Sequence, residues 1–170
     1  MLVESKLRVG ELYKYQRERR VKNEMTDSTP SISASGKWCY TPFIKDTRSI
    51  NDNTFMEAYT KTPPDEWTGT LEGNSEDIYS AVILSTGEWD AAGVVLFDGA
   101  VENRKGTLVI WFMGNRLNGE ADWSGKWVIL LGTDELVNLR GEGTWWGPGA
   151  PEVGKKGCVD YSGKIHFESG

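Results

Sequence analysis

The chain has one histidine, two cysteines and six tyrosines, and these few groups limit the chemistry that it can perform. His166 follows Cys158 at roughly 26 Å along an extended strand, which rises about 3.3 Å per residue, so the two cannot form a Cys–His pair. A single histidine also excludes a multi-histidine metal site, and the plentiful Asp and Glu residues show no ligand-set spacing. Nucleophilic and metal-dependent catalysis are therefore disfavoured, and we expect no cofactor and no metal.

The remaining candidates are groups that hold or polarise a substrate. Tyr79 and Tyr161 are the candidate catalytic hydrogen-bond donors, because a buried phenol can polarise a carbonyl in a dry site. Glu57 shares a strand face with Phe55 and Tyr59 and is the candidate interior carboxylate, with an exposed glutamate as the alternative. Such a site suits an intramolecular ring closure, because good orientation of two reacting ends can contribute roughly 7 to 11 kcal/mol.

The region after residue 36 predicts the strands that must position these side chains. It has no proline between Asp65 and Gly147, while glycine recurs and Trp, Val, Ile, Tyr and Thr are abundant. We expect an all-β fold of about nine antiparallel segments, either a sandwich or, preferably, a closed barrel. The predicted strand segments are 37–43, 54–61, 66–73, 77–85, 92–101, 106–114, 121–131, 137–146 and 158–168.

Alternation in the last three segments places large rings and glycines on one apolar face. Trp123 and Trp127 share a face with Gly125, and Tyr161 shares one with Gly163. The glycines either leave a cavity walled by flat rings or let the rings pack against the backbone. The first interpretation predicts these substrate-binding residues: Phe97, Phe112, Trp123, Trp127, Trp145 and Phe167.

Charge divides the chain into a basic start and an acidic remainder. Residues 1–23 hold seven basic and three acidic side chains, a balance of +4, so the total of −6 leaves −10 for the rest. We expect a basic helical arm at 1–24, a flexible linker at 25–36 and one barrel domain at 37–170. The arm is a candidate lid over the barrel, with a solvated arm or a dimer contact as alternatives; its apolar residues are Leu7, Leu12, Tyr13 and Tyr15.

The sequence predicts a soluble, cytoplasmic protein. Its opening residues are interrupted by charge every few positions, unlike a secretory signal, and no apolar run approaches the roughly 18 residues of a membrane span. Cys39 and Cys158 are accordingly expected to be free, buried thiols. The acidic balance argues against nucleic acid as a partner, and a homodimer is possible for such a barrel.

Several stretches resemble a family of small, mostly uncharacterised bacterial proteins with the allene oxide cyclase-like barrel. They are 69–73 (GTLEG), 97–99 (FDG), 104–110 (RKGTLVI) and, most specifically, 132–143 (GTDELVNLRGEG). The resemblance implies an eight-stranded antiparallel β-barrel of the calycin-like kind, with a hydrophobic interior. Val95 and Phe112 stand where the family often has an acidic residue and a histidine, so no catalytic residue carries over.

The resemblance also indicates a function. Related barrels include allene oxide cyclases and polyketide ring-closing enzymes, such as the spirotetronate and spirotetramate [4+2] cyclases. They imply a cofactor-independent cyclase or isomerase, of Diels–Alderase or related type, on a hydrophobic polyketide-like or lipid-like substrate in natural-product biosynthesis. One alternative is a small-molecule-binding barrel without chemistry, and a lower-ranked one, from the many tryptophans, is a carbohydrate-binding module.

Overall fold

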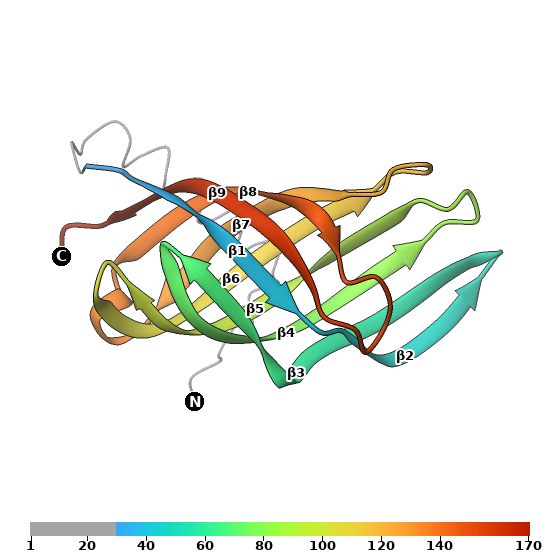
Figure 1. Ribbon diagram of the computed structural model, residues 1–170, viewed down its shortest axis with the longest axis horizontal. Helices are drawn as coiled ribbons and strands as arrows, with labels where there is room; N and C mark the ends of the chain where they lie inside the picture. Colours follow the sequence, from blue (N-terminus) through green and yellow to red (C-terminus); the bar gives the residue numbers. More distant parts are fainter. Residues whose placement is uncertain (1–29) are drawn as a thin grey trace, which may run out of the picture. The chain divides into compact units, whose positions relative to one another are not determined.

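The computed structural model describes residues 30–170, which form nine strands and one short 3₁₀ turn (Figure 1). The predicted arm, the lid residues and the first part of the predicted linker lie outside these residues. The elements are β1 (Ile32–Tyr40), β2 (Phe43–Ile50), β3 (Asn53–Gly69), β4 (Leu71–Ile83), β5 (Trp89–Val101), β6 (Arg104–Arg116), β7 (Trp123–Gly132), η1 (Asp134–Leu136), β8 (Leu139–Gly149) and β9 (Gly157–Phe167).

Eight of the strands close into an antiparallel barrel. The sheet order is β1-β9-β8-β7-β6-β5-β4-β3-β2, and a further pairing between β1 and β3 joins the two sides. Gly36 to Cys39 of β1 face Gly69 to Glu66 of β3 in this closing pair, while β2 extends the sheet beyond the closed wall. The predicted all-β barrel is confirmed, and closure rules out the sandwich.

Strand β3 differs from the prediction because it is a single strand of 17 residues. Its first half pairs with β2 and its second half with β1, and the register against β4 shifts between Thr60 and Asp65. Pro63 and Pro64 lie within this shift, where the strand needs no ladder hydrogen bond from them. The two prolines therefore mark a β-bulge rather than a turn between two strands.

The sequence analysis also misplaced the start of the barrel. β1 begins at Ile32, so residues 32–36 of the predicted linker are strand. β2 was not predicted, because its side chains are almost all exposed and show no alternation of apolar and polar positions. Asn51 and Asp52, both with positive φ, form the two-residue turn that joins β2 to β3.

The disulfide between Cys39 and Cys158 corrects the expectation of two free thiols. The two residues are separated by 119 positions, but they face each other directly in the β1–β9 pair. Closure of the barrel brings the first and last strands together, which neither cysteine's sequence neighbourhood reveals. The half-buried disulfide thus ties together the strands that begin and end the barrel.

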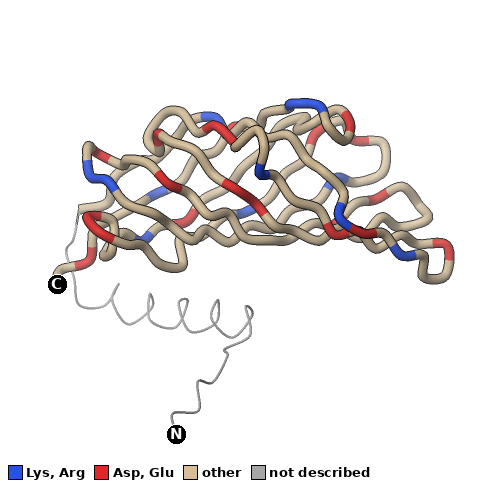
Figure 2. The backbone as a smooth tube through the Cα atoms, turned by 90° about the horizontal axis from the view of Figure 1, so that it is seen from below, with Lys and Arg blue, Asp and Glu red and all other residues tan. Residues whose placement is uncertain are grey.

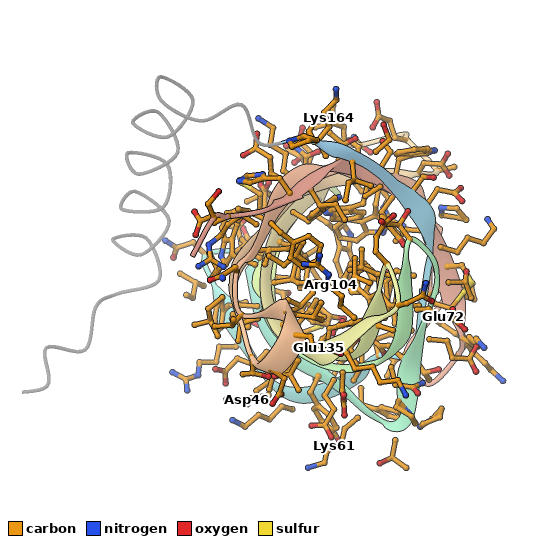
Figure 3. The ribbon with its side chains drawn as sticks, turned by 90° about the vertical axis from the view of Figure 1, so that its left-hand side faces the viewer. Asp46, Lys61, Glu72, Arg104, Glu135 and Lys164 are labelled. Atoms are coloured by element: carbon orange, nitrogen blue, oxygen red, sulfur yellow. A yellow bond between two sulfur atoms is a disulfide. The ribbon has the colours of Figure 1, made fainter. Side chains whose placement is uncertain are left out.

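One end of the barrel is closed by aliphatic side chains. Leu136 of η1 is fully buried against this layer, and the Arg104 guanidinium lies 3.8 Å from the centre of the Phe167 ring. Figure 3 looks onto this closed end, where Arg104 lies over the middle of the barrel. The other members of the layer are Leu71, Val101, Leu108, Leu139 and Ile165.

Large rings packed onto glycines fill the middle of the barrel. A Cβ atom on Gly163 would lie 2.6 Å from the Trp127 ring, and one on Gly125 would lie 2.6 Å from the Trp145 ring. Real Cβ contacts are almost never shorter than 3.0 Å, so these positions have no room for a side chain. These glycines therefore make space for the rings, as the packing interpretation predicted.

The outside of the barrel carries both signs of charge. Figure 2 shows acidic and basic positions interspersed along the strands. None of the helical structure within residues 30–170 is long and apolar enough to cross a membrane.

Candidate functional site

A cavity of about 50 Å³ lies inside the barrel toward the end opposite η1, here called the open end. The hairpins β2–β3, β4–β5 and β6–β7 project at this end (Figure 1). The walls come from six strands, β1, β4, β5, β6, β7 and β8, because inward positions of every second residue meet there. The lining residues are Trp38, Tyr40, Asp77, Tyr79, Ala91, Phe112, Trp123 and Trp145.

The aromatic walls hold one another in place through edge contacts. The Phe112 ring lies 5.3 Å from Trp38, 6.0 Å from Tyr79 and 6.3 Å from Trp145, in each case edge to face. Trp38 in turn stacks on Trp67, 5.1 Å away and nearly parallel. Contacts of this kind stabilise aromatic pairs beyond simple burial, so the rings of the inner wall support one another.

The rings nearest the opening are less enclosed. Tyr40, Tyr79 and Trp123 are half-buried, whereas Trp38, Phe112 and Trp145 are buried. The Tyr40 hydroxyl accepts a hydrogen bond from the Ala150 backbone N–H at 3.3 Å. The three half-buried rings are therefore the side chains whose movement would enlarge the cavity.

Two carboxyl groups, Asp65 and Asp77, are buried beside this cavity. Their side chains are 1% and 2% exposed, and Asp77 forms part of the cavity wall. Asp65 follows the bulge of β3, and Asp77 is an inward position of the neighbouring strand β4. Two acidic groups this far from water are unusual in a barrel core unless they are hydrogen-bonded.

Ser75 bridges the two carboxyl groups. Its Oγ lies 3.3 Å from Asp65 Oδ2 and 3.3 Å from Asp77 Oδ1, and it accepts a hydrogen bond from Trp67 Nε1 at 2.9 Å. Trp38 Nε1 donates to Asp65 Oδ2 at 3.0 Å. Two tryptophans of the barrel core thus use their ring nitrogens to fix this polar group.

Burial raises the pKa of both carboxyl groups. The pKa of Asp77 lies well above its usual range, mainly through loss of water and secondly through the nearby charge of Asp65. Loss of water also raises the pKa of Asp65, while hydrogen bonds from Asp77, Trp38, Thr60 and Ser75 oppose that rise. Because two adjacent carboxylates repel each other, the pair retains a proton more readily than either group would alone.

Four of the predicted site residues meet at the cavity. Phe112, Trp123 and Trp145 line it, as does Tyr79, whose pKa is raised by burial, so that its phenol stays protonated.

The second predicted donor, Tyr161, is committed elsewhere. Its hydroxyl accepts from the Leu71 backbone N–H at 2.9 Å and donates to the Thr68 carbonyl at 3.0 Å. Tyr161 does not line the cavity, and burial raises the pKa of its phenol. These bonds tie β9 to the β3–β4 corner, so in the structure Tyr161 links strands.

Three predicted substrate-binding rings also lie away from the cavity. Phe97 is buried in the middle of the barrel 6.0 Å from Trp67, and Phe167 lies under Arg104 at the closed end. Trp127 is buried over glycines, and its Nε1 donates to the carbonyls of Thr144 and Ser162. Alternation identified Trp127 and Phe167 as facing inward, but it does not give the depth of a residue along the barrel, which depends on the stagger between strands.

Glu57 is not an interior carboxylate. It lies on the face of β3 opposite the buried Met56 and Ala58, together with the exposed Tyr59. The interior carboxylates are Asp65 and Asp77, which the sequence analysis missed because it left residues 62–65 between two predicted strands and began another strand at residue 77. A single strand through 71–83 would have placed Asp77 on the inward face with Leu71 and Ala81.

A larger depression of about 820 Å³ lies outside the barrel over β4 to β8. Its side chains are mainly outward-facing and of mixed character, including Val82, Met113, Lys126 and Trp146. It holds no buried carboxyl group, so the inner cavity is the better candidate site. Within residues 30–170, no group of three or more His, Cys, Asp or Glu side chains could hold a metal ion.

Comparison with known proteins identifies a family. Residues 44–146, more than half of the chain, match the family described as "Protein of unknown function (DUF3224)". The range includes Asp65 and Asp77 but excludes β1 and β9. No curated protein gives a significant match.

Two solved structures share the fold at low sequence identity. A DUF3224 family protein of unknown function from Shewanella oneidensis MR-1 has a TM-score of 0.64 and 17% identity, covering 83% of this chain and 100% of its own. The pterocarpan synthase dirigent protein GePTS1 has a TM-score of 0.53 and 14% identity, covering 86% of this chain and 96% of its own. Both similarities concern the barrel architecture.

Proposed function

Because the chain belongs to the DUF3224 family, whose function is unknown, we propose a function from the site itself. The barrel binds a flat, apolar small molecule at its open end and closes a ring in that molecule, or isomerises it, without a cofactor. The observation that carries this proposal is the cavity itself, which is lined by six aromatic rings and by Asp77 of the buried carboxyl pair. Apolar walls with a few polar groups are typical of small-molecule sites.

The substrate must enlarge the cavity in order to enter. A volume of about 50 Å³ is far below the roughly 300–1,000 Å³ of typical small-molecule pockets. Tyr40, Tyr79 and Trp123 are half-buried at the opening, so their rings can turn outward while the buried inner wall stays in place. Entry then replaces contacts between aromatic rings by contacts between those rings and a flat ligand.

Two further points support chemistry rather than storage alone. The dirigent protein with a similar barrel is named a pterocarpan synthase, which supports a synthase role for a barrel of this architecture. The resemblance to ring-closing barrels, including the [4+2] cyclases, points the same way. A tight cavity with few polar groups suits catalysis by positioning, which needs no metal or nucleophile.

A binding barrel without chemistry is the second candidate. The observation in its favour is that Tyr161, one of the two expected donors, is fully used in linking strands. The partner in both cases is a hydrophobic small molecule. The cytoplasmic location stays a prediction, and the Cys39–Cys158 disulfide is more typical of a non-reducing compartment.

Incubation with unsaturated ketones that can cyclise tests the proposal, with 2′-hydroxychalcone as the first probe. Ring closure to flavanone leaves the mass unchanged and alters the retention time, so chromatography with mass detection measures it. We expect faster conversion than in buffer, a several-fold loss in Trp123→Ala at the cavity mouth, and wild-type rates in Trp146→Ala on the outer face. Binding without conversion would favour the binding barrel, and absence of binding would contradict both candidates.

A further inference from the structure

We propose that Asp77 is the acid of this site and donates its proton to an oxygen atom of the bound molecule, while Asp65 and Ser75 position it. The inference rests on the proposed function, since it requires a ligand in the inner cavity. It adds the catalytic group and the chemical class of the substrate, which is a flat molecule with a carbonyl oxygen.

Position distinguishes the two carboxyl groups. Asp77 forms part of the cavity wall, together with the rings of Tyr79 and Phe112, whereas Asp65 does not line the cavity. Both carboxyl groups are almost completely buried, so bulk water cannot carry a proton from either group to the ligand, and the donating group must touch the ligand. Asp77 is therefore the member of the pair that can touch a ligand, and Asp65 acts through it.

The hydrogen-bond geometry places a proton between the two groups. Ser75 Oγ accepts from Trp67 Nε1, and its single hydrogen can be donated to only one of the two carboxyl oxygens 3.3 Å away. The other contact is a hydrogen bond only if that carboxyl group is itself protonated. Asp65 Oδ1 is also buried without a donor, which is costly for a pair of bare carboxylates.

The surroundings assign this proton to Asp77. Asp65 accepts from Trp38 Nε1 and from the hydroxyls of Thr60 and Ser75, and these donors favour its charged form. Asp77 has fewer such donors, and both burial and the charge of Asp65 raise its pKa. The other titratable groups that interact with the pair are the phenols of Tyr40 and Tyr79, both kept protonated by burial. Environments that separate two pKa values in this way are typical of acid and base partners.

A conjugated ketone with an internal hydroxyl group illustrates the step. The Asp77 proton moves to the ketone oxygen as the hydroxyl oxygen forms a bond to the β-carbon and the carbon–carbon double bond shifts to give an enol. The hydroxyl proton passes to the Asp77 carboxylate, which restores the acid. The proton on the enol oxygen then moves to the α-carbon, which restores the ketone. The overall change is an isomerisation with no oxidant and no leaving group.

Infrared difference spectroscopy of the full chain at neutral pH tests the assignment. Wild type minus Asp77→Asn should show the C=O stretching band of a protonated carboxyl group. Wild type minus Asp98→Asn, a matched control at an exposed outward position of β5, should not show it. Addition of trans-chalcone should shift the band, while trans-stilbene, which has a similar shape but no carbonyl, should leave it unmoved.

The kinetic expectation follows from the same roles. Asp77→Asn keeps a hydrogen-bond donor but cannot give up a proton, so it should retain chalcone binding and lower the kcat for 2′-hydroxychalcone by about 10²- to 10⁴-fold. Absence of the carboxyl band, or a band that chalcone leaves unmoved, would overturn the assignment to Asp77 while leaving the binding function intact. Failure of both chalcone and stilbene to bind would overturn the proposed function and this inference with it.

Discussion

The packing of Trp127 over Gly163 shows how single residues determine the interior. The ring occupies the space of a missing side chain, and its Nε1 is fixed by two backbone carbonyls. Alternation correctly predicted that Trp123, Trp127 and Trp145 face inward. It could not decide between a cavity and packed rings, because that outcome depends on contacts with other strands.

Gly163→Ala should destabilise the barrel by about 1–3 kcal/mol, the usual cost of overpacking a core. The added methyl group would lie 2.6 Å from the Trp127 ring and even closer to the Glu142 carbonyl, so the ring or the strand must move. Thermal and urea unfolding measure the change, with Ser162→Ala on the opposite face of β9 as the control. Stability equal to the control would contradict the packed interior.

Among the elements, β3 and β4 supply the buried carboxyl pair, and the predicted segments 54–61, 66–73 and 77–85 did not match their bounds. On either side of the bulge at the two prolines, β3 pairs with β4, while its other edge pairs first with β2 and then with β1; Asp65 follows the bulge directly. Most strands from β5 to β9 were predicted to within a few residues, because glycine and turn residues mark their ends. Around Asp77, β4 has polar residues on both faces, so the alternation of apolar and polar positions that predicts a strand is weaker there.

The β1–β9 disulfide should contribute about 2–4 kcal/mol to stability, because it joins residues 119 positions apart and restricts the unfolded chain. A Cys39→Ala/Cys158→Ala variant should therefore unfold at a lower temperature than oxidised wild type. Dithiothreitol should lower the wild-type midpoint toward that of the variant and leave the variant unchanged. An equal midpoint for oxidised wild type and the variant would contradict this role.

For the whole molecule, the buried carboxyl pair makes stability depend on pH. The folded pKa of Asp77 is raised above the unfolded value of about 3.9, so the native state holds a proton that the unfolded chain releases. The free energy of unfolding should therefore fall as pH rises from about 4 through the raised pKa, by about 1.4 kcal/mol for each unit between the two values.

Asp77→Asn removes this titration. Its stability relative to wild type should increase from pH 4 to pH 7, as measured by urea unfolding at each pH. Parallel pH profiles for the two proteins would show that Asp77 has an ordinary pKa in the folded barrel.

Two-dimensional NMR of the ¹⁵N-labelled indole groups during titration with trans-chalcone tests the central claim most directly. The chain has eight tryptophans; Trp123 lines the inner cavity, Trp146 lines the outer depression and Trp127 lies deeper in the barrel. Binding at the open end predicts a saturable shift of the Trp123 signal, with the signals of Trp127 and Trp146 unchanged. A shift confined to Trp146, or no saturable shift at Trp123, would contradict the inner cavity as the ligand site.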